Sequence, residues 1–372
     1  MNIQRPRARK RGHGLRAPLI VLMVLALAGC GLPGKFGEAS ADARPGRLVA
    51  LPDGRRLNLV CSGRGSPTVI LEAGFGATAG AWHKAQPELA RRTHVCAYDR
   101  AGYGFSDPGP LPRDGAAIAR DLDHALTAAR ITGPLILVGH SAGGLYVRLF
   151  AARRPRMVAG LVLLDTTVER RAPRPAGDGL DGIRRRLRRC LATSETSPQP
   201  PPTDARWGGC ISGSSDAQVI RVAQRPETWR SQLSELDNIF GRTSDEVSRI
   251  GSVLQNVPMY VITSSQSAAA SPSYRFETLS VLELQHRAIA EQSDTGFQQT
   301  VMSSHMVMLD RPDVVVRAVQ KMVAASRSGR TPPPLPPSET EQPLDEELLP
   351  ELDIDSDPLP PPPIVAPQPW PR

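Results

Sequence analysis

The feature that most constrains the fold is a five-residue turn between an apolar run and a helical stretch. Residues 134–138 are continuously apolar, Gly139-His140-Ser141-Ala142-Gly143 follows at once, and residues 143–153 continue with a helical pattern. A short apolar run bounded by turn residues predicts a buried strand. A strand that enters a helix through such a turn is typical of a parallel sheet covered by helices. The turn therefore predicts α/β architecture around Ser141.

Strands and helices alternate on both sides of this turn. Further strands are expected at residues 47–49, 56–61, 68–71, 93–98, 160–164, 257–263 and 299–302, and further helices at 79–91, 118–129, 276–291 and 312–325. The first two strands flank Pro52-Asp53-Gly54, which predicts a hairpin. The later alternation predicts a mostly parallel eight-stranded sheet flanked by helices.

Two regions depart from this alternation. Residues 169–249 are rich in arginine, proline, serine and tryptophan, and we interpret them as a cap inserted into a core of residues 47–168 and 250–325. From Thr331 to Arg372 the chain has 15 prolines and nine carboxylates with almost no aromatic residues. Such a composition cannot bury a core, so residues 326–372 are expected to be a disordered acidic tail. A proline-rich recognition segment is the alternative.

The N-terminus resembles a bacterial lipoprotein signal. A basic segment precedes the apolar run 19–28, which ends in Leu27-Ala28-Gly29-Cys30. The resemblance implies lipid attachment to the Cys30 thiol and removal of residues 1–29. A transmembrane anchor is the alternative, but it needs about 20 apolar residues. We expect an exported lipoprotein with a flexible spacer at residues 30–46, anchored on the periplasmic or cell-surface side. Gly31 after Cys30 favours the outer membrane.

Charge and cysteine content narrow the possible partners. Six of the cations behind the formal charge of +8 lie in the leader, and no basic helix with interleaved aromatic residues is present, so nucleic-acid binding is not expected. Beyond Cys30 the chain has four cysteines, an even number in a compartment where disulfides persist. Two disulfides are possible, and free buried thiols are the alternative. The four cysteines are Cys61, Cys96, Cys190 and Cys210.

Three stretches resemble the α/β-hydrolase family. They are the Gly-His-Ser-Ala-Gly turn, Leu71-Glu72-Ala73-Gly74-Phe75 after the third strand, and the segment from Asp99-Arg100 to Ser106-Asp107 after the fourth. The resemblance implies that Ser141 is a nucleophile on a tight elbow and that the amides of Phe75 and Ala142 form an oxyanion hole. Ala73 replaces the usual histidine of its loop. The resemblance also implies that Asp99 and Arg100 are mainly architectural.

A serine hydroxyl needs a histidine base to become a good nucleophile. Among the seven histidines, His305 alone follows the last strand and precedes a helix, the place where the family keeps its base. The usual position of the acid, after strand 257–263, has no carboxylate before Glu277. A second known position is the end of the strand after the nucleophile helix, which Asp165 occupies. Asp165 is therefore the expected acid, with Glu277 or a purely structural Asp165 as alternatives.

The family resemblance also bears on the cysteines. Strands two and four are neighbours in the family's sheet, which would bring Cys61 near Cys96, and both Cys190 and Cys210 fall in the cap. No Cys or His pair at ligand spacing predicts a metal site, and the short glycine turns lack the remaining signature of a dinucleotide site. No cofactor is expected.

The expected reaction is acyl transfer to water on a small-molecule carboxylic ester, through an acyl-enzyme on Ser141. Peptidase, thioesterase, lactonase and C–C hydrolase activities remain alternatives, because the cap sets substrate choice. A non-catalytic surface lipoprotein that uses the fold as a binding module is a further alternative. The oligomeric state is left open.

Overall fold

The fold is built around one eight-stranded sheet with the strand order β1-β2-β4-β3-β5-β6-β7-β8. The computed structural model describes residues 45–169, 180–211, 217–271 and 279–339. Pairings β1–β2 and β2–β4 are antiparallel, and the others are parallel. The predicted mostly parallel sheet is confirmed. Its strands are β1 (Arg47–Ala50), β2 (Arg56–Ser62), β3 (Thr68–Glu72), β4 (Val95–Tyr98), β5 (Leu135–His140), β6 (Val158–Leu164), β7 (Met259–Ser264) and β8 (Gly296–Val301).

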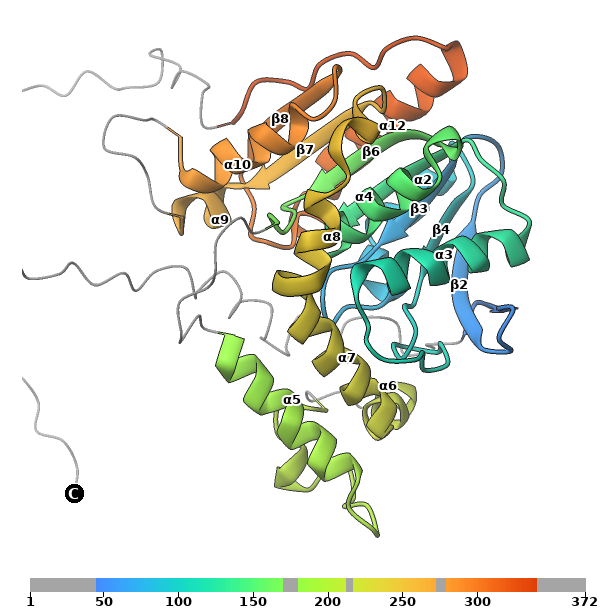
Figure 1. Cartoon of the computed structure of the whole chain (residues 1–372), viewed down its shortest axis with the longest axis vertical. Coiled ribbons are helices and arrows are strands. Elements are labelled where there is room, and N and C mark those ends of the chain that lie inside the picture. The colour runs from blue at the N-terminus through green and yellow to red at the C-terminus, as the bar shows by residue number, and fades with distance from the viewer. Residues whose placement is uncertain (1–44, 170–179, 212–216, 272–278, 340–372) are drawn as a thin grey trace, which may run out of the picture.

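Helices cover both faces of this sheet (Figure 1). One face is covered by α3 (Gly115–Ala129), α4 (Gly143–Arg153) and α10 (Val281–Ala290), and the other by α2 (Ala85–Ala90), α11 (Val307–Asp310) and α12 (Pro312–Ser328). The central strands bury apolar side chains on both faces, as all of β5 and β7 illustrate. A strand buried on both sides reads as a continuous apolar run, which is why β5 was predictable.

The helix expected at residues 79–91 is broken in two. A 3-10 helix, η2 (Ala79–Trp82), is followed by α2 (Ala85–Ala90). Pro87 explains the break, because proline has no N–H to bond the carbonyl four residues earlier, at His83, and its ring crowds that carbonyl.

The folded part of the chain extends beyond the expected boundary at residue 325. Helix α12 continues to Ser328, and residues 337–339 form hydrogen bonds with β8. The Glu339 amide donates to the Thr300 carbonyl at 3.0 Å, and the Thr300 amide donates to Ser338 Oγ at 2.9 Å. Glu339 also pairs with Arg311 at 2.7 Å. The start of the predicted tail is thus bound to the edge of the sheet, and residues 340–372 lie outside the described residues.

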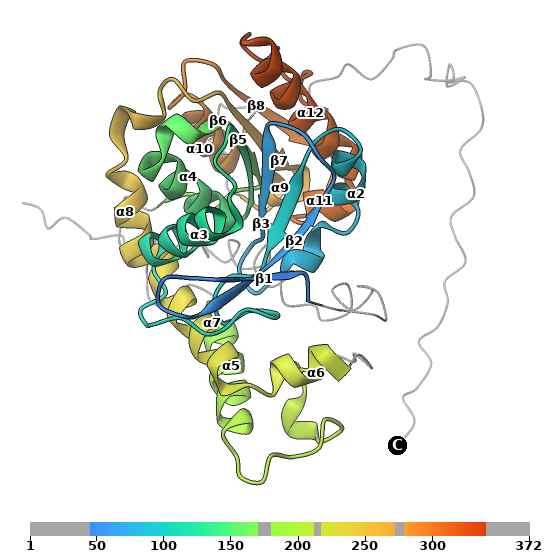
Figure 2. The same ribbon diagram turned by 90° about the vertical axis from the view of Figure 1, so that its right-hand side faces the viewer.

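Between β6 and β7 the described residues form helices. They are α5 (Leu180–Ser194), η4 (Ala205–Trp207), α6 (Ala217–Ala223), α7 (Pro226–Asn238), the π-helical turn η5 (Ile239–Thr243), α8 (Ser244–Ser248) and η6 (Gly251–Leu254). Figure 2 shows α5, α6 and α7 at one end of the sheet, away from the helices that cover its faces. We call the segment from α5 to η5 the cap.

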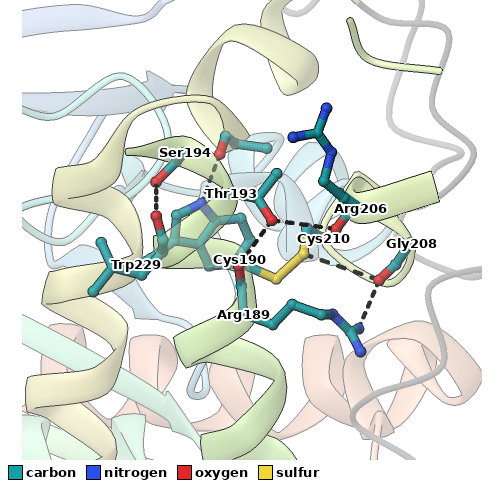
Figure 3. Close-up of a disulfide and its surroundings, with 10 residues drawn as sticks. Arg189, Cys190, Thr193, Ser194, Arg206, Gly208, Cys210 and Trp229 are labelled. Carbon is teal, nitrogen blue, oxygen red and sulfur yellow. Dashed lines mark hydrogen bonds between the residues drawn. A yellow bond between two sulfur atoms is a disulfide. The ribbon is translucent and has the colours of Figure 1, made fainter. Parts of the chain in front are cut away.

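The cap has its own small core and its own disulfide. Helix α5 packs against α7, and Leu187, Trp229 and Leu236 are among the buried residues between them. Cys190 belongs to this cluster and forms a disulfide with Cys210 (Figure 3). The second disulfide joins Cys61 to Cys96, which face each other across β2 and β4. Both pairings expected from the sequence are therefore present.

Several expectations fall on residues that the structure does not describe. The signal peptide, Cys30 and most of the spacer lie there, as does Glu277. Among the described residues, no helix is long and apolar enough to span a membrane.

Candidate active site

The three residues expected to carry chemistry lie at the carboxyl edge of the parallel sheet. Ser141 follows β5, Asp165 follows β6, and His305 follows β8. Side chains that follow neighbouring parallel strands meet at this edge, which is where ligands bind in open α/β sheets. The fold therefore gathers residues that are far apart in the chain.

Ser141 sits on a strained turn. Its φ is +52°, in the left-handed region that non-glycine residues seldom adopt. Gly143 explains how the turn closes, because a Cβ there would lie 2.6 Å from the Glu72 carbonyl oxygen. The strained backbone holds Ser141 between strand and helix, as expected of a nucleophile elbow. Asp165 also has a positive φ, +41°, which the sequence did not indicate.

Asp165 and His305 are in direct contact. Nδ1–H of His305 donates to Oδ2 of Asp165 at 2.5 Å. The other carboxylate contacts come from the end of β7 and from α9 (Ser265–Ala269): the Ser264 amide donates to Oδ1 at 3.0 Å, and Ser267 Oγ donates to Oδ2 at 2.5 Å. Neither serine was predicted to contact Asp165, although both follow the predicted strand 257–263, where the acid usually stands.

Electrostatics keep the Asp165 carboxylate charged. Burial alone would raise the pKa of Asp165, but the hydrogen bond and charge of His305 outweigh it, so the net shift is downward. With Nδ1 donating to this carboxylate, the neutral His305 ring carries its lone pair on Nε2. This is the tautomer that a general base requires.

His140 supports the His305 loop from within the elbow. Its Nε2–H donates to the His305 carbonyl at 2.9 Å, and the two ring centroids are 4.7 Å apart. Burial lowers the pKa of His140 to about 3, so its ring is neutral at physiological pH. The sequence indicated that His140 lies in the elbow but did not indicate this contact.

A pocket opens at this edge between core and cap. Its core wall includes Gly74, Phe75, His140, Ser141, Ala142, Thr167 and Met306, and its cap wall includes Leu180, Ile183, Leu236, Ile239 and Phe240. The cap wall is apolar throughout. An uncharged, apolar ligand group would therefore fit against the cap, with its polar atoms towards Ser141.

The two amides expected to form an oxyanion hole both belong to pocket residues. Neither the Phe75 nor the Ala142 amide donates a hydrogen bond to any described residue. Gly74 precedes Phe75 in a crowded place, where a Cβ would lie 2.8 Å from His140 Nδ1 and 3.1 Å from Ser141 Cβ. The backbone of this loop can therefore approach Ser141 only because Gly74 has no side chain.

The described residues include one cluster with metal-ligand residue types that the sequence did not indicate. Potential ligand atoms of Cys61, His94 and Cys96 lie within 4.8 Å of one another. Both sulfurs are joined in a disulfide, so neither is a thiolate that could bind a metal.

Asp99 has the expected architectural role. Its carboxylate accepts hydrogen bonds from the Ala79 and Phe105 amides at 2.8 and 3.0 Å.

Three curated relatives show how far the sequence likeness extends. The chain is 22% identical over 267 residues to the uncharacterized protein YqjL of Bacillus subtilis, covering 71% of this chain and 86% of that protein. It is 40% identical over 103 residues to the Klebsiella pneumoniae protein named "Putative carbamate hydrolase RutD", covering 27% and 38%. It is 33% identical over 128 residues to an uncharacterized vacuolar membrane protein of Saccharomyces cerevisiae, 31% of this chain but only 20% of that protein's length.

Solved structures share the fold over a longer stretch. The epoxide hydrolase CorEH superposes with a TM-score of 0.55 at 18% identity, covering 75% of this chain and 98% of that one. Cfl2 of Burkholderia cenocepacia superposes with a TM-score of 0.54 at 21% identity, covering 74% and 95%. The family model described as the alpha/beta hydrolase family matches residues 69–318. This chain therefore belongs to the alpha/beta hydrolase family.

Proposed function

We propose that this alpha/beta hydrolase cleaves carboxylic esters with an apolar acyl or alcohol group, through an acyl-enzyme on Ser141. The observation that carries the proposal is the buried Asp165–His305 contact at 2.5 Å, beside a serine on a strained elbow that lines an apolar pocket. Ser141 Oγ attacks the ester carbonyl, and His305 Nε2 takes its proton. Asp165 stabilises the imidazolium that forms.

The amides of Phe75 and Ala142 would stabilise the tetrahedral oxyanion. His305 returns the proton to the leaving alcohol, and water then repeats the sequence to release the acid and free Ser141. The serine separates this reaction from epoxide and haloalkane hydrolysis, in which an alkyl-enzyme forms on a carboxylate nucleophile. Structural likeness to an epoxide hydrolase thus supports the fold and not that substrate.

The test is labelling with a fluorophosphonate, combined with hydrolysis of p-nitrophenyl esters. Wild-type protein should be labelled on Ser141 and should hydrolyse p-nitrophenyl butyrate. Ser141→Ala should remove both activities, with a loss of up to about 10⁶ in kcat, and leave the unfolding temperature nearly unchanged. Residual activity above a few per cent, with contamination excluded, would contradict the assignment.

Carbamate hydrolysis is the second candidate. The relative from Klebsiella pneumoniae, 40% identical over 103 residues, has carbamate hydrolase in its name. A carbamate offers the same carbonyl carbon to Ser141. Comparing kcat/KM for a p-nitrophenyl carbamate and the matched ester would rank the two substrates.

We also propose that the protein is exported and held on a membrane by a lipid on Cys30. The Leu27-Ala28-Gly29-Cys30 pattern supports this, and so do the two disulfides, which persist in oxidising compartments. Cys30→Ser should release the protein from the membrane fraction. Continued membrane association with an uncleaved leader would argue for a transmembrane anchor instead.

A further inference from the structure

A buried arginine lies directly behind the loop that carries the Phe75 amide. Arg100 follows β4 and is only 2% exposed. Nη1 donates to Glu72 Oε1 at 2.7 Å and to the Ala73 carbonyl at 2.6 Å. Nη2 donates to the Gly74 carbonyl at 2.8 Å. The guanidinium therefore holds two successive carbonyls of this loop.

The remaining donors of Arg100 bind the cap. Nε donates to Glu235 Oε2 at 3.2 Å, and Nη2 donates to Glu235 Oε1 at 3.1 Å. Glu235 belongs to α7 and also accepts from the Tyr146 hydroxyl at 3.0 Å. A guanidinium has five N–H donors, and five hydrogen bonds leave Arg100. All five donors are therefore used. Three bind Glu72 and the carbonyls of Ala73 and Gly74, and two bind Glu235 in the cap.

The bond to the Gly74 carbonyl acts on the neighbouring amide. The Gly74 carbonyl and the Phe75 N–H belong to one planar trans peptide, so they point in opposite directions. Fixing the carbonyl oxygen towards Arg100 therefore fixes the N–H away from Arg100. A cationic donor on the carbonyl also polarises the peptide, which makes its N–H a stronger donor.

The charge on Arg100 is secure in this place. Burial disfavours the guanidinium, but Glu235 and Glu72 hold the pKa of Arg100 well above its ordinary value. The rings of Tyr103 and Tyr146 lie 4.6 and 5.4 Å from the guanidinium carbon and add favourable cation–π contacts. The mainly architectural role that the family resemblance implies for Arg100 does not account for its bonds to two consecutive loop carbonyls.

We propose that Arg100 is a positioning residue that orients and polarises the Phe75 amide of the oxyanion hole, and that Glu235 of the cap holds Arg100 in place. This inference rests on the proposed acyl transfer. It makes the oxyanion hole complete only when α7 is seated on the core. The cap then influences the chemical step as well as the choice of substrate.

The first experiment replaces Arg100 by lysine, which keeps the charge but has three donors on one nitrogen. A lysine cannot serve two carbonyls and two carboxylates at once. We expect kcat for p-nitrophenyl butyrate, per Ser141 titrated with fluorophosphonate, to fall about 10- to 100-fold, with KM within about threefold. Loss of a whole oxyanion donor costs about 10²–10³ in kcat, which sets the upper limit.

Inhibition by a trifluoromethyl ketone supplies a readout that stability does not affect. Ser141 adds to this ketone and forms a charged hemiketal that needs the oxyanion hole, so the inhibition constant should rise by the same factor as kcat falls. Arg113→Lys is the matched control. Arg113 is equally buried, at 3% exposed, and pairs with Asp121 at 2.6 Å without a contact to this loop. The Arg113→Lys variant should be less stable than the wild type but should keep the wild-type kcat per titrated Ser141.

Glu235→Gln tests the link to the cap and serves if Arg100→Lys does not fold. It removes the charge that holds Arg100 but leaves every loop contact of Arg100 possible. We expect kcat per site to fall about three- to tenfold with a parallel rise in the ketone inhibition constant. Unchanged kcat and inhibition constant in a folded Arg100→Lys, or in Glu235→Gln, would overturn the inference while Ser141 labelling upheld the proposed function. A wild-type protein without labelling or hydrolysis would overturn both.

Discussion

The core edge and the cap contribute to the pocket in different ways. On the core side, each polar group is held by strand ends and short hydrogen bonds, as the contacts from Ser264, Ser267 and His305 to Asp165 show. On the cap side, the pocket wall consists of apolar side chains from α5, α7 and η5. The difference fits our proposal if the core supplies the catalytic groups and the apolar wall of the cap selects the substrate, with the Glu235–Arg100 contact as the link from the cap to the chemical step. A change at the Asp165 end of the core should therefore affect all esters alike, whereas a change in the apolar wall of the cap should affect them unequally.

After Ser141→Ala, the largest effect is expected from Asp165→Asn. The amide cannot fix the same histidine tautomer or stabilise the imidazolium, so kcat should fall by about 10⁴, which corresponds to about 5.4 kcal/mol in the barrier. Because this is a core effect, acetate and octanoate esters should lose the same factor. Steady-state kinetics on a series of p-nitrophenyl esters would measure it.

Two outcomes at Asp165 would contradict the assignment of chemistry to the core and substrate choice to the cap wall. Near-normal kcat with a lowered unfolding temperature would make Asp165 structural. A loss that differs strongly between acetate and octanoate esters would mean that Asp165 also determines substrate choice. Ser267→Ala is a graded companion, because it removes only one of the hydrogen bonds to the same carboxylate.

The next prediction compares the effects of removing each of the two disulfides. The cap bridge closes a separation of 20 residues and the core bridge one of 35, worth about 3 and about 4 kcal/mol in the loop-closure model. Replacing Cys190 and Cys210 by alanine should loosen the cap, whose bridge lies beside Trp229 and α5 (Figure 3). We expect a several-fold rise in KM for octanoate esters with little change in kcat for acetate.

The control is the double variant in which Cys61 and Cys96 are both replaced by alanine. Because this bridge joins β2 to β4 in the sheet, its loss should lower the main unfolding transition and leave the relative KM values unchanged. Thermal unfolding and ester kinetics on both double variants separate the two predictions. Equal loss of substrate preference in both would show that cap and core do not act separately.

Local patterns in the sequence were sufficient for the parts of the site that lie on regular elements. The elbow at Ser141 could be predicted because a buried strand, a glycine-bounded turn and a helix follow one another directly. His305 could be predicted because it follows the last strand, where the resemblance to the alpha/beta hydrolase family implies the base. Strand and helix periodicity, which comes from residues close in the chain, located both places.

The contacts that were missed are distant in sequence or come from residues without periodicity. Arg100 and Glu235 are 135 residues apart, and α7 lies in a region whose composition does not indicate how it packs. Strand β8 begins at Gly296, whereas the sequence predicted a start at Gln299. The earlier start was missed because the polar Gln298 is not typical of a buried strand. Each finds a partner: Gln298 donates to Thr263 Oγ1 and Gln299 to the Pro337 carbonyl.

The bound part of the C-terminal segment was missed for a related reason. Proline-rich sequence has no apolar periodicity, yet its backbone carbonyls still accept hydrogen bonds. Tyr260 donates to the Pro333 carbonyl, and Lys321 donates to the Pro334 carbonyl at 2.8 Å. Composition predicted a solvated tail because it counts side chains and not these backbone acceptors.

The last effect concerns acid, and it tests whether the sensitivity to pH belongs to the core. Residues 169–249 contain no histidine, whereas His140 and His286 are buried in the core. Burial lowers the pKa of both, that of His140 to about 3. Unfolding exposes each ring to water, where its pKa returns to about 6.5.

The sign follows from proton binding. Between about pH 6.5 and 3, the unfolded chain holds a proton on His140 that the folded protein does not, so the free energy of unfolding falls as pH falls. The slope is about 1.4 kcal/mol per pH unit for this one group. Glu72 acts in the opposite sense, because burial raises its pKa to about 7 and the folded protein binds the extra proton.

His140→Gln isolates the histidine from these other groups. Glutamine keeps an N–H that can donate to the His305 carbonyl, but it does not titrate. The difference in unfolding free energy between wild type and variant should therefore shift in favour of the variant by about 1.4 kcal/mol for each pH unit below 6.5. Urea unfolding at pH 4, 5, 6 and 7 would measure this. Parallel pH profiles for the two proteins would show that His140 is protonated in the folded core, and the acid sensitivity would then have to come from elsewhere.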